Sequence, residues 1–100
     1  MKLGILVNTD KHAGNVAGIT KAALAKGHEV MIFMMDAGNQ LLSNADVSGL
    51  CNEEGVSMSF CDHSAQALGI SKEGIPEKIS CGSQFDNANM NAAADRVIVL

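Results

Sequence analysis

Short apolar runs that end in polar residues recur along this 100-residue chain, and they alternate with stretches of helical periodicity. The runs over residues 3–7 and 29–35 are almost continuously apolar, which is typical of parallel strands buried on both faces. A third run, residues 56–60, alternates apolar and polar side chains, so we expect a less buried strand. Residues 77–80 and 96–100 predict two more, for about five strands.

Helical stretches separate these strands. Residues 13–26 carry apolar side chains at helical spacing, and residues 46–54 predict a second, short helix that Asp46 would cap. A helical turn is expected over residues 65–68, and another helix over residues 83–94. This alternation predicts an α/β fold, a three-layer sandwich around a mostly parallel central sheet of about five strands, in the manner of flavodoxin.

Length and charge limit the organisation and the partners. One hundred residues fit a single domain over residues 1–100. Net charge is −4, Arg96 is the one arginine, and Trp and Tyr are absent, so nucleic acid is not an expected partner. The apolar run 30–35 is far shorter than the roughly 20 residues that cross a bilayer, and no signal peptide is visible. We therefore expect a cytoplasmic protein without a membrane partner.

Three cysteines are an odd number, which disfavours a disulfide framework in a reducing compartment. Cys51 shares a predicted helical face with Val47 and Leu50, which indicates a core residue. Cys61 and Cys81 each end or follow a predicted strand, so each needs an explanation of its own.

The carboxyl ends of the strands are where open α/β sheets bind ligands. Polar and reactive side chains gather at these ends in the sequence. The candidate pocket residues, chosen only by this position, are Asn8, Thr9, Asp36, Ser64 and Cys81.

Cys61 is the strongest candidate for a nucleophile. It lies between a strand and a helical turn, where free N–H groups favour the thiolate. His63 would supply a positive charge or shuttle a proton, whereas the carboxylate of Asp62 would oppose the thiolate. The alternative is that Cys61 is a small buried core residue.

Cys81 has two interpretations. If its strand neighbours the third strand, Cys81 would approach Cys61 and resolve an oxidised or persulfidated thiol. Otherwise it packs under a loop.

Cys61, His63 and Cys81 lack closely spaced ligand pairs, and the loop after the first strand lacks the Gly, Ser and Thr density of a phosphate cradle. We therefore predict no metal and no cofactor.

The pair Leu41-Leu42 stands in a polar segment, residues 39–44, that is expected to be a loop. Exposed, the pair would form an assembly surface. Folded back onto the core, it would only anchor the loop.

Several segments in order resemble a known family. They are Ala25–Val30, the strand running to Asp36-Ala37-Gly38, Val56–Phe60 feeding Cys61, Ser64-Ala65 with Leu68-Gly69, and Ala94–Leu100. Together they resemble the DsrE/DsrF-like proteins, which include the TusD-type sulfur-relay subunits, and the resemblance covers nearly the whole chain. One departure is Leu68, because many members carry an arginine before the matching glycine.

The resemblance implies a compact α/β fold and assembly into a homotrimer or homohexamer. It also implies that Cys61 accepts a persulfide sulfur from a donor protein and passes it to an acceptor protein. Our first hypothesis is therefore a sulfur carrier or sulfurtransferase subunit, with Cys61 as nucleophile and His63 handling protons. The alternatives are a dithiol redox protein using Cys61 and Cys81, and a non-enzymatic homo-oligomeric assembly or binding subunit.

Overall fold

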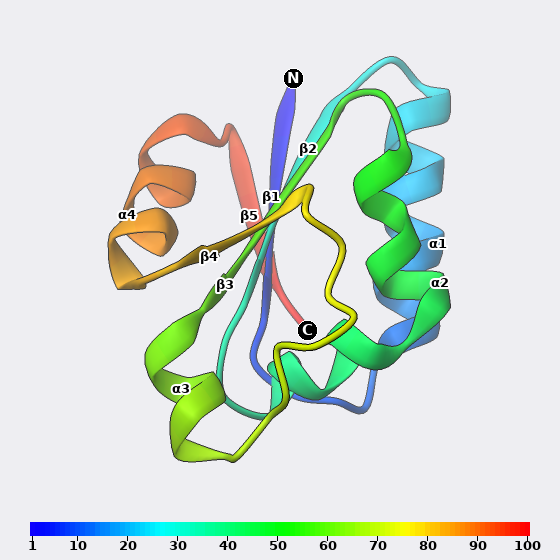
Figure 1. The fold of residues 1–100 in the computed structure, drawn as a ribbon. Coiled ribbons are helices and arrows are strands. Elements are labelled where there is room, and N and C mark those ends of the chain that lie inside the picture. Colours follow the sequence, from blue (N-terminus) through cyan, green and yellow to red (C-terminus); the bar gives the residue numbers. More distant parts are fainter.

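A central sheet of five parallel strands, in the order β4-β3-β2-β1-β5, organises the computed structural model of residues 1–100 (Figure 1). The strands are β1 (Lys2–Val7), β2 (Glu29–Met34), β3 (Val56–Cys61), β4 (Ile79–Gly82) and β5 (Arg96–Val99). The predicted three-layer α/β architecture is confirmed, and the sheet is parallel throughout.

Helices cover both faces of the sheet (Figure 1). One face carries α1 and α2, the other carries α4, and α3 lies at the edge where the strands end. The helices are α1 (Ala13–Ala25), α2 (Ala45–Ser48), α3 (Asp62–Ala67) and α4 (Gln84–Ala93), with two 3-10 helices, η1 (Asp36–Ser43) and η2 (Gly49–Asn52).

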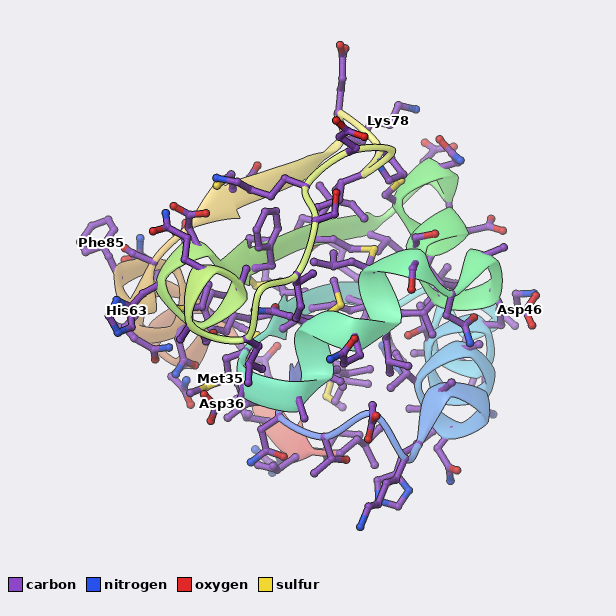
Figure 2. The ribbon with its side chains drawn as sticks, turned by 60° about the horizontal axis from the view of Figure 1, so that its bottom comes forward. Met35, Asp36, Asp46, His63, Lys78 and Phe85 are labelled. Atoms are coloured by element: carbon purple, nitrogen blue, oxygen red, sulfur yellow. The ribbon has the colours of Figure 1, made fainter.

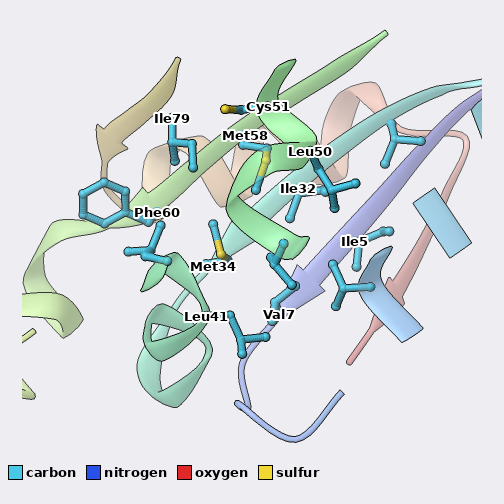
Figure 3. Packing of buried hydrophobic residues seen from close by; sticks show 14 of the residues in the cluster. Ile5, Val7, Ile32, Met34, Leu41, Leu50, Cys51, Met58, Phe60 and Ile79 are labelled. Carbon is cyan, nitrogen blue, oxygen red and sulfur yellow. The ribbon is translucent and has the colours of Figure 1, made fainter. Parts of the chain in front are cut away.

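The two faces of the sheet hold cores of very different size. The face under α1 and α2 carries a cluster of 15 buried residues, with Ile5, Ile32 and Met58 side by side across three strands (Figure 3). Cys51 belongs to this cluster, as its helical pattern predicted. Only Phe33, Cys61 and Met90 form the buried cluster on the α4 face. Cys61 therefore lies in the smaller and less deeply covered core.

Leu41 and Leu42 lie in the larger core, with 6% and 4% of their surface exposed. The prediction of a polar loop over residues 39–44 is wrong, because η1 winds this segment into a 3-10 helix. That helix turns both leucines inward against the sheet, where they anchor the segment. Of the two interpretations of this pair, the assembly surface is therefore excluded.

The second helix also differs from the prediction. Asn44 caps it, because the Asn44 Oδ1 accepts hydrogen bonds from the N–H groups of Asp46 (3.0 Å) and Val47 (3.3 Å). Asp46 lies inside the first turn instead, where its charge still favours the helix start. The α-helix ends at Ser48, and η2 continues the segment.

The fourth strand begins two residues later than predicted. Pro76 does not enter a strand, because its carbonyl oxygen accepts the Ile79 N–H at 3.0 Å in a turn. That turn delays the strand, which then extends through Cys81 to Gly82.

Gly38 brings the start of η1 against the end of β1. A Cβ atom on Gly38 would collide with the carbonyl group of Val7. The same carbonyl oxygen accepts the Met35 N–H at 2.9 Å. Because no side chain separates the two backbones, the segment after β2 crosses closely over the end of β1.

We expect Gly38→Ala to lower the free energy of unfolding by about 1–3 kcal/mol, because the new methyl group must displace backbone. Gly18→Ala is the matched control. Gly18 lies in α1 with nothing near its Cβ position, so alanine there should stabilise the helix by about 0.5–1 kcal/mol. Urea denaturation of both variants measures the difference, and equal stabilities would contradict the close approach.

Candidate functional site

All five strands end at one edge of the sheet, since all are parallel. The ends of β2, β3 and β4 are neighbours at this edge, with β3 in the middle. Asp36 follows β2, Cys61 ends β3 and Gln84 begins α4 just after β4. Figure 2 views the molecule with this edge turned forward.

Cys61 is the last residue of β3 and the N-cap residue of α3. Its side chain is only 3% exposed. Burial raises the pKa of the Cys61 thiol, but hydrogen bonds from Ser64, from the Gln84 side chain and from the His63 N–H outweigh burial. The resulting pKa is below that of an ordinary cysteine, which favours the thiolate.

A buried amide holds the backbone around Cys61. The Asn39 side chain is fully buried, and its Nδ2 donates to the Cys61 carbonyl oxygen (3.0 Å) and to Ser64 Oγ (3.2 Å). Ser64 Oγ also accepts the Asp36 N–H (3.0 Å) and lies 3.3 Å from the Cys61 carbonyl oxygen. Its single hydroxyl proton donates to that oxygen when Cys61 is a neutral thiol and turns to the sulfur when Cys61 is a thiolate. These bonds join the end of β2 to the end of β3.

Asp36 contributes its backbone rather than its carboxylate. It is the one residue other than glycine with a positive φ, 50°, and that conformation directs its N–H to Ser64. Its side chain is exposed and points away from the molecule (Figure 2). Of the predicted pocket residues, Asp36 and Ser64 are therefore brought next to Cys61.

His63 is exposed, and its imidazole points outward (Figure 2). The backbone N–H of His63, and not its ring, contacts the Cys61 thiol. The structure thus brings His63 to the site through its backbone, and the predicted proton-handling role of the imidazole stays a prediction.

Asn8 and Thr9 lie at the same edge but apart from Cys61. They follow β1, which is separated from β3 by β2, a spacing of about 10 Å between the two strands. The Asn8 N–H donates to the Leu100 carbonyl oxygen at 3.1 Å, and Thr9 Oγ1 is buried without a hydrogen-bond partner. These two residues do not join the Cys61 cluster.

Cys81 lies on the strand next to Cys61 but faces the other way. The register of β3 and β4 pairs Phe60 with Cys81 and Cys61 with Gly82. Because successive side chains of a strand alternate between faces, Cys81 shares the face of Phe60 and Cys61 lies on the opposite face. Of the two interpretations of Cys81, the approach to Cys61 is therefore disfavoured although the two strands are neighbours, and all three cysteines are free.

Asp62 acts on Cys81 rather than on Cys61. Its carboxylate accepts hydrogen bonds from Lys72 Nζ and from Gln66 Nε2, both at 2.8 Å. Burial raises the pKa of the Cys81 thiol, and the Asp62 carboxylate raises it further. Asp62 is not among the groups that shift the Cys61 pKa. The exposed cysteine is therefore the poorer thiolate.

Gln84, like Asn39, is a residue of the site that the sequence did not predict. Its Nε2 donates to Met35 Sδ at 3.7 Å, and its side chain is one of the groups that lower the pKa of Cys61. The sequence feature that points to Gln84 is its position directly after Ser83, the N-cap residue of α4, at the edge where β4 ends. A neutral amide carries neither a charge nor a nucleophile that would distinguish it in the sequence.

Cys61 lines none of the four surface hollows of the structure. The largest, about 520 Å³, lies between η1 and the segment after α3, beside Leu42, Leu68 and Ile70.

No three His, Cys, Asp or Glu side chains converge on a point where a metal ion would be held. None of the helices combines the length and the apolar character that crossing a membrane requires.

The fold has clear counterparts among solved structures. YchN protein from E. coli matches with a TM-score of 0.74 at 12% identity, over 100% of both chains. MTH1491 from Methanobacterium thermoautotrophicum, a protein of unknown function, matches with a TM-score of 0.75 at 15% identity, over 99% of this chain and 98% of its own. This chain therefore shares the fold of both structures. No protein-family model and no curated protein matches the sequence.

We expect Ser64→Ala to raise the pKa of Cys61 and to cost about 1–3 kcal/mol of stability, because Asn39 and the Asp36 N–H lose an acceptor. A thiol with a lowered pKa stabilises the fold above its unfolded pKa, and this contribution is lost as pH falls through the folded pKa. The variant should therefore lose more stability at alkaline than at neutral pH, measured by urea denaturation at both. Ser57→Ala, an exposed position on β3, is the control, and a loss independent of pH would count against a role in the thiolate.

We expect Asp62→Asn to lower the pKa of Cys81 and to leave that of Cys61 unchanged, because the carboxylate raises only the former. Alkylation rates of the two cysteines across pH, resolved by peptide mass spectrometry, test this. A shift in the Cys61 profile with a constant Cys81 profile would refute the assignment.

Proposed function

We propose that this protein is a sulfur carrier that accepts a persulfide sulfur on Cys61 from a donor protein and passes it to an acceptor protein. The observation that carries the proposal is the Cys61 thiol at the carboxyl edge of the sheet, with a pKa lowered by hydrogen bonds. The fold is consistent with that of the DsrE/DsrF-like sulfur-relay proteins, which the sequence resembles.

The transfer is a thiolate exchange without net oxidation. The Cys61 thiolate attacks the outer sulfur of the donor persulfide, forming a new S–S bond on Cys61. The S–S bond of the donor breaks, and the donor cysteine leaves as a thiolate, while the proton of the outer sulfur stays with that sulfur. An acceptor thiolate then attacks the same outer sulfur and releases Cys61 as a thiolate.

A protein donor suits the surroundings of Cys61. No surface hollow encloses this thiol for a small molecule, yet its neighbours His63 and Gln84 are exposed, so the cover over the sulfur is thin. Phe85, next to Gln84, has 71% of its surface exposed and offers an apolar contact to a docking chain (Figure 2). A donor cysteine presented on a protein would reach Cys61 by displacing this cover.

A homotrimer or homohexamer and a cytoplasmic location form part of this proposal. The assembly surface must use residues other than Leu41 and Leu42, which are buried. The edge strand β5 offers one exposed apolar residue, Val99. A dithiol redox function through Cys61 and Cys81 is disfavoured, because their side chains lie on opposite faces of the sheet.

Intact mass after incubation with glutathione persulfide tests the proposal. We expect the parent protein to gain one sulfur atom that a reductant removes, and Cys61→Ser to gain none, because the low-pKa thiol is the acceptor. Cys81→Ser is the matched control and should gain sulfur as the parent does. Equal sulfur uptake by the parent and Cys61→Ser would overturn the proposal.

A further inference from the structure

A small hollow lies on the α4 face of the sheet, beside the first turns of α4. Helix α4 packs mainly against β1 and β2, so the same face of β3 and β4 lies uncovered beside the helix. Ser59 and Ser80 are neighbours on this uncovered part, and Phe33 of β2 lies next to Ser59 in the register. Together with Asp86 and Met90 of α4 they line a volume of about 190 Å³, which we call the α4 hollow.

Asp86 is the one charged residue that lines the α4 hollow. Its Oδ2 accepts the Ser83 N–H at 2.9 Å as part of the capping box of α4, which fixes the carboxylate in place. Its Oδ1 accepts no hydrogen bond, and no cation of the chain pairs with it, since the one salt bridge joins Lys72 to Asp62. The α4 hollow therefore contains a fixed carboxylate with one oxygen atom free to accept.

This carboxylate lies beside Cys61. The register of β3 and β4 pairs Cys61 with Gly82, so both residues face α4. A Cβ atom on Gly82 would collide with Asp86 Oδ2, so the carboxylate fills the space that a side chain on Gly82 would take. Because neighbouring strands are about 4.8 Å apart, the carboxylate lies roughly 5 Å from the Cβ atom of Cys61. A group bound to Asp86 is thus held next to the candidate nucleophile.

The lining of the α4 hollow suits a cation on an apolar stem. Phe33 and Met90 give it an apolar floor, and the hydroxyl groups of the half-buried Ser59 and the exposed Ser80 can accept hydrogen bonds. Sites for whole small molecules enclose about 300–1,000 Å³, so the smaller α4 hollow fits a single side chain. A guanidinium group offers planar donors to a carboxylate and to hydroxyls, and its three-carbon stem covers apolar surface.

We propose that the α4 hollow binds an arginine side chain of a partner protein, with Asp86 as the counter-ion. The net charge of −4 favours a basic partner, because opposite charges steer association and fix the orientation of the complex. An arginine held in the α4 hollow positions its protein beside Cys61. This role in sulfur transfer rests on the proposed function, whereas the preference of the hollow for a guanidinium group does not.

Titration of the intact protein with n-propylguanidinium, which reproduces the arginine side chain, tests the site. We expect two-dimensional NMR to show saturable shifts of the backbone amides of Ser59, Ser80 and Asn89, which line the hollow. The uncharged analogue n-propylurea should bind at least about tenfold more weakly, because it forms no ion pair. Asp86→Asn keeps an oxygen atom that accepts the Ser83 N–H but loses the charge, so it should weaken n-propylguanidinium binding about tenfold.

Asp46→Asn is the matched control, because Asp46 also lies in the first turn of a helix, α2, which covers the other face of the sheet. It should bind n-propylguanidinium as the parent does. Equal affinity for the two probes, or unchanged binding by Asp86→Asn, would overturn the inference. If Arg96 of a second copy of this chain fills the hollow, n-propylguanidinium would instead lower the mass of the assembly in sedimentation, and the assignment to a partner protein would be wrong. The titration involves no sulfur transfer, so a failed sulfur carrier leaves its outcome unchanged.

Discussion

The buried amide of Asn39 is the interaction on which the site depends. Its Nδ2 binds both the Cys61 carbonyl oxygen and Ser64 Oγ, and thereby ties η1, the segment after β2, to the end of β3 and the start of α3. Ser64 in turn accepts the Asp36 N–H and helps to lower the Cys61 pKa. Leaving the buried Asn39 amide without its acceptors would lower the free energy of unfolding, so the hydrogen bonds to Cys61 and Ser64 fix the position of these two residues.

The two faces of the sheet have different roles. The larger core packs the fold, and the smaller core holds the candidate nucleophile Cys61. Most buried apolar residues lie under α1 and α2, and this core does not include Cys61. The smaller core under α4 holds Cys61 with Phe33 and Met90, close to exposed residues. A reactive thiol placed in the larger core would be desolvated without hydrogen-bond donors, and its pKa would rise.

One residue of register gives Cys61 and Cys81 opposite chemical characters. Pairing with Gly82 leaves Cys61 on the α4 face, where Gln84 and backbone N–H groups favour a thiolate. Pairing with Phe60 places Cys81 on the other face, beside the carboxylate of Asp62. The two thiols on these neighbouring strands thus lie on opposite faces of the sheet. The pKa of Cys61 is lowered, whereas that of Cys81 is raised.

The sequence by itself determined the strand–helix alternation, the parallel sheet and the position of Cys61 at a strand end, because buried strands require near-continuous apolar runs. The tertiary structure alone decided that Leu41 is buried. It also decided that Asp62 raises the pKa of Cys81 and that Gln84 lowers the pKa of Cys61. Those outcomes depend on register between strands and on the path of a 3-10 helix. Both arise from contacts between residues distant in sequence, which no local pattern encodes.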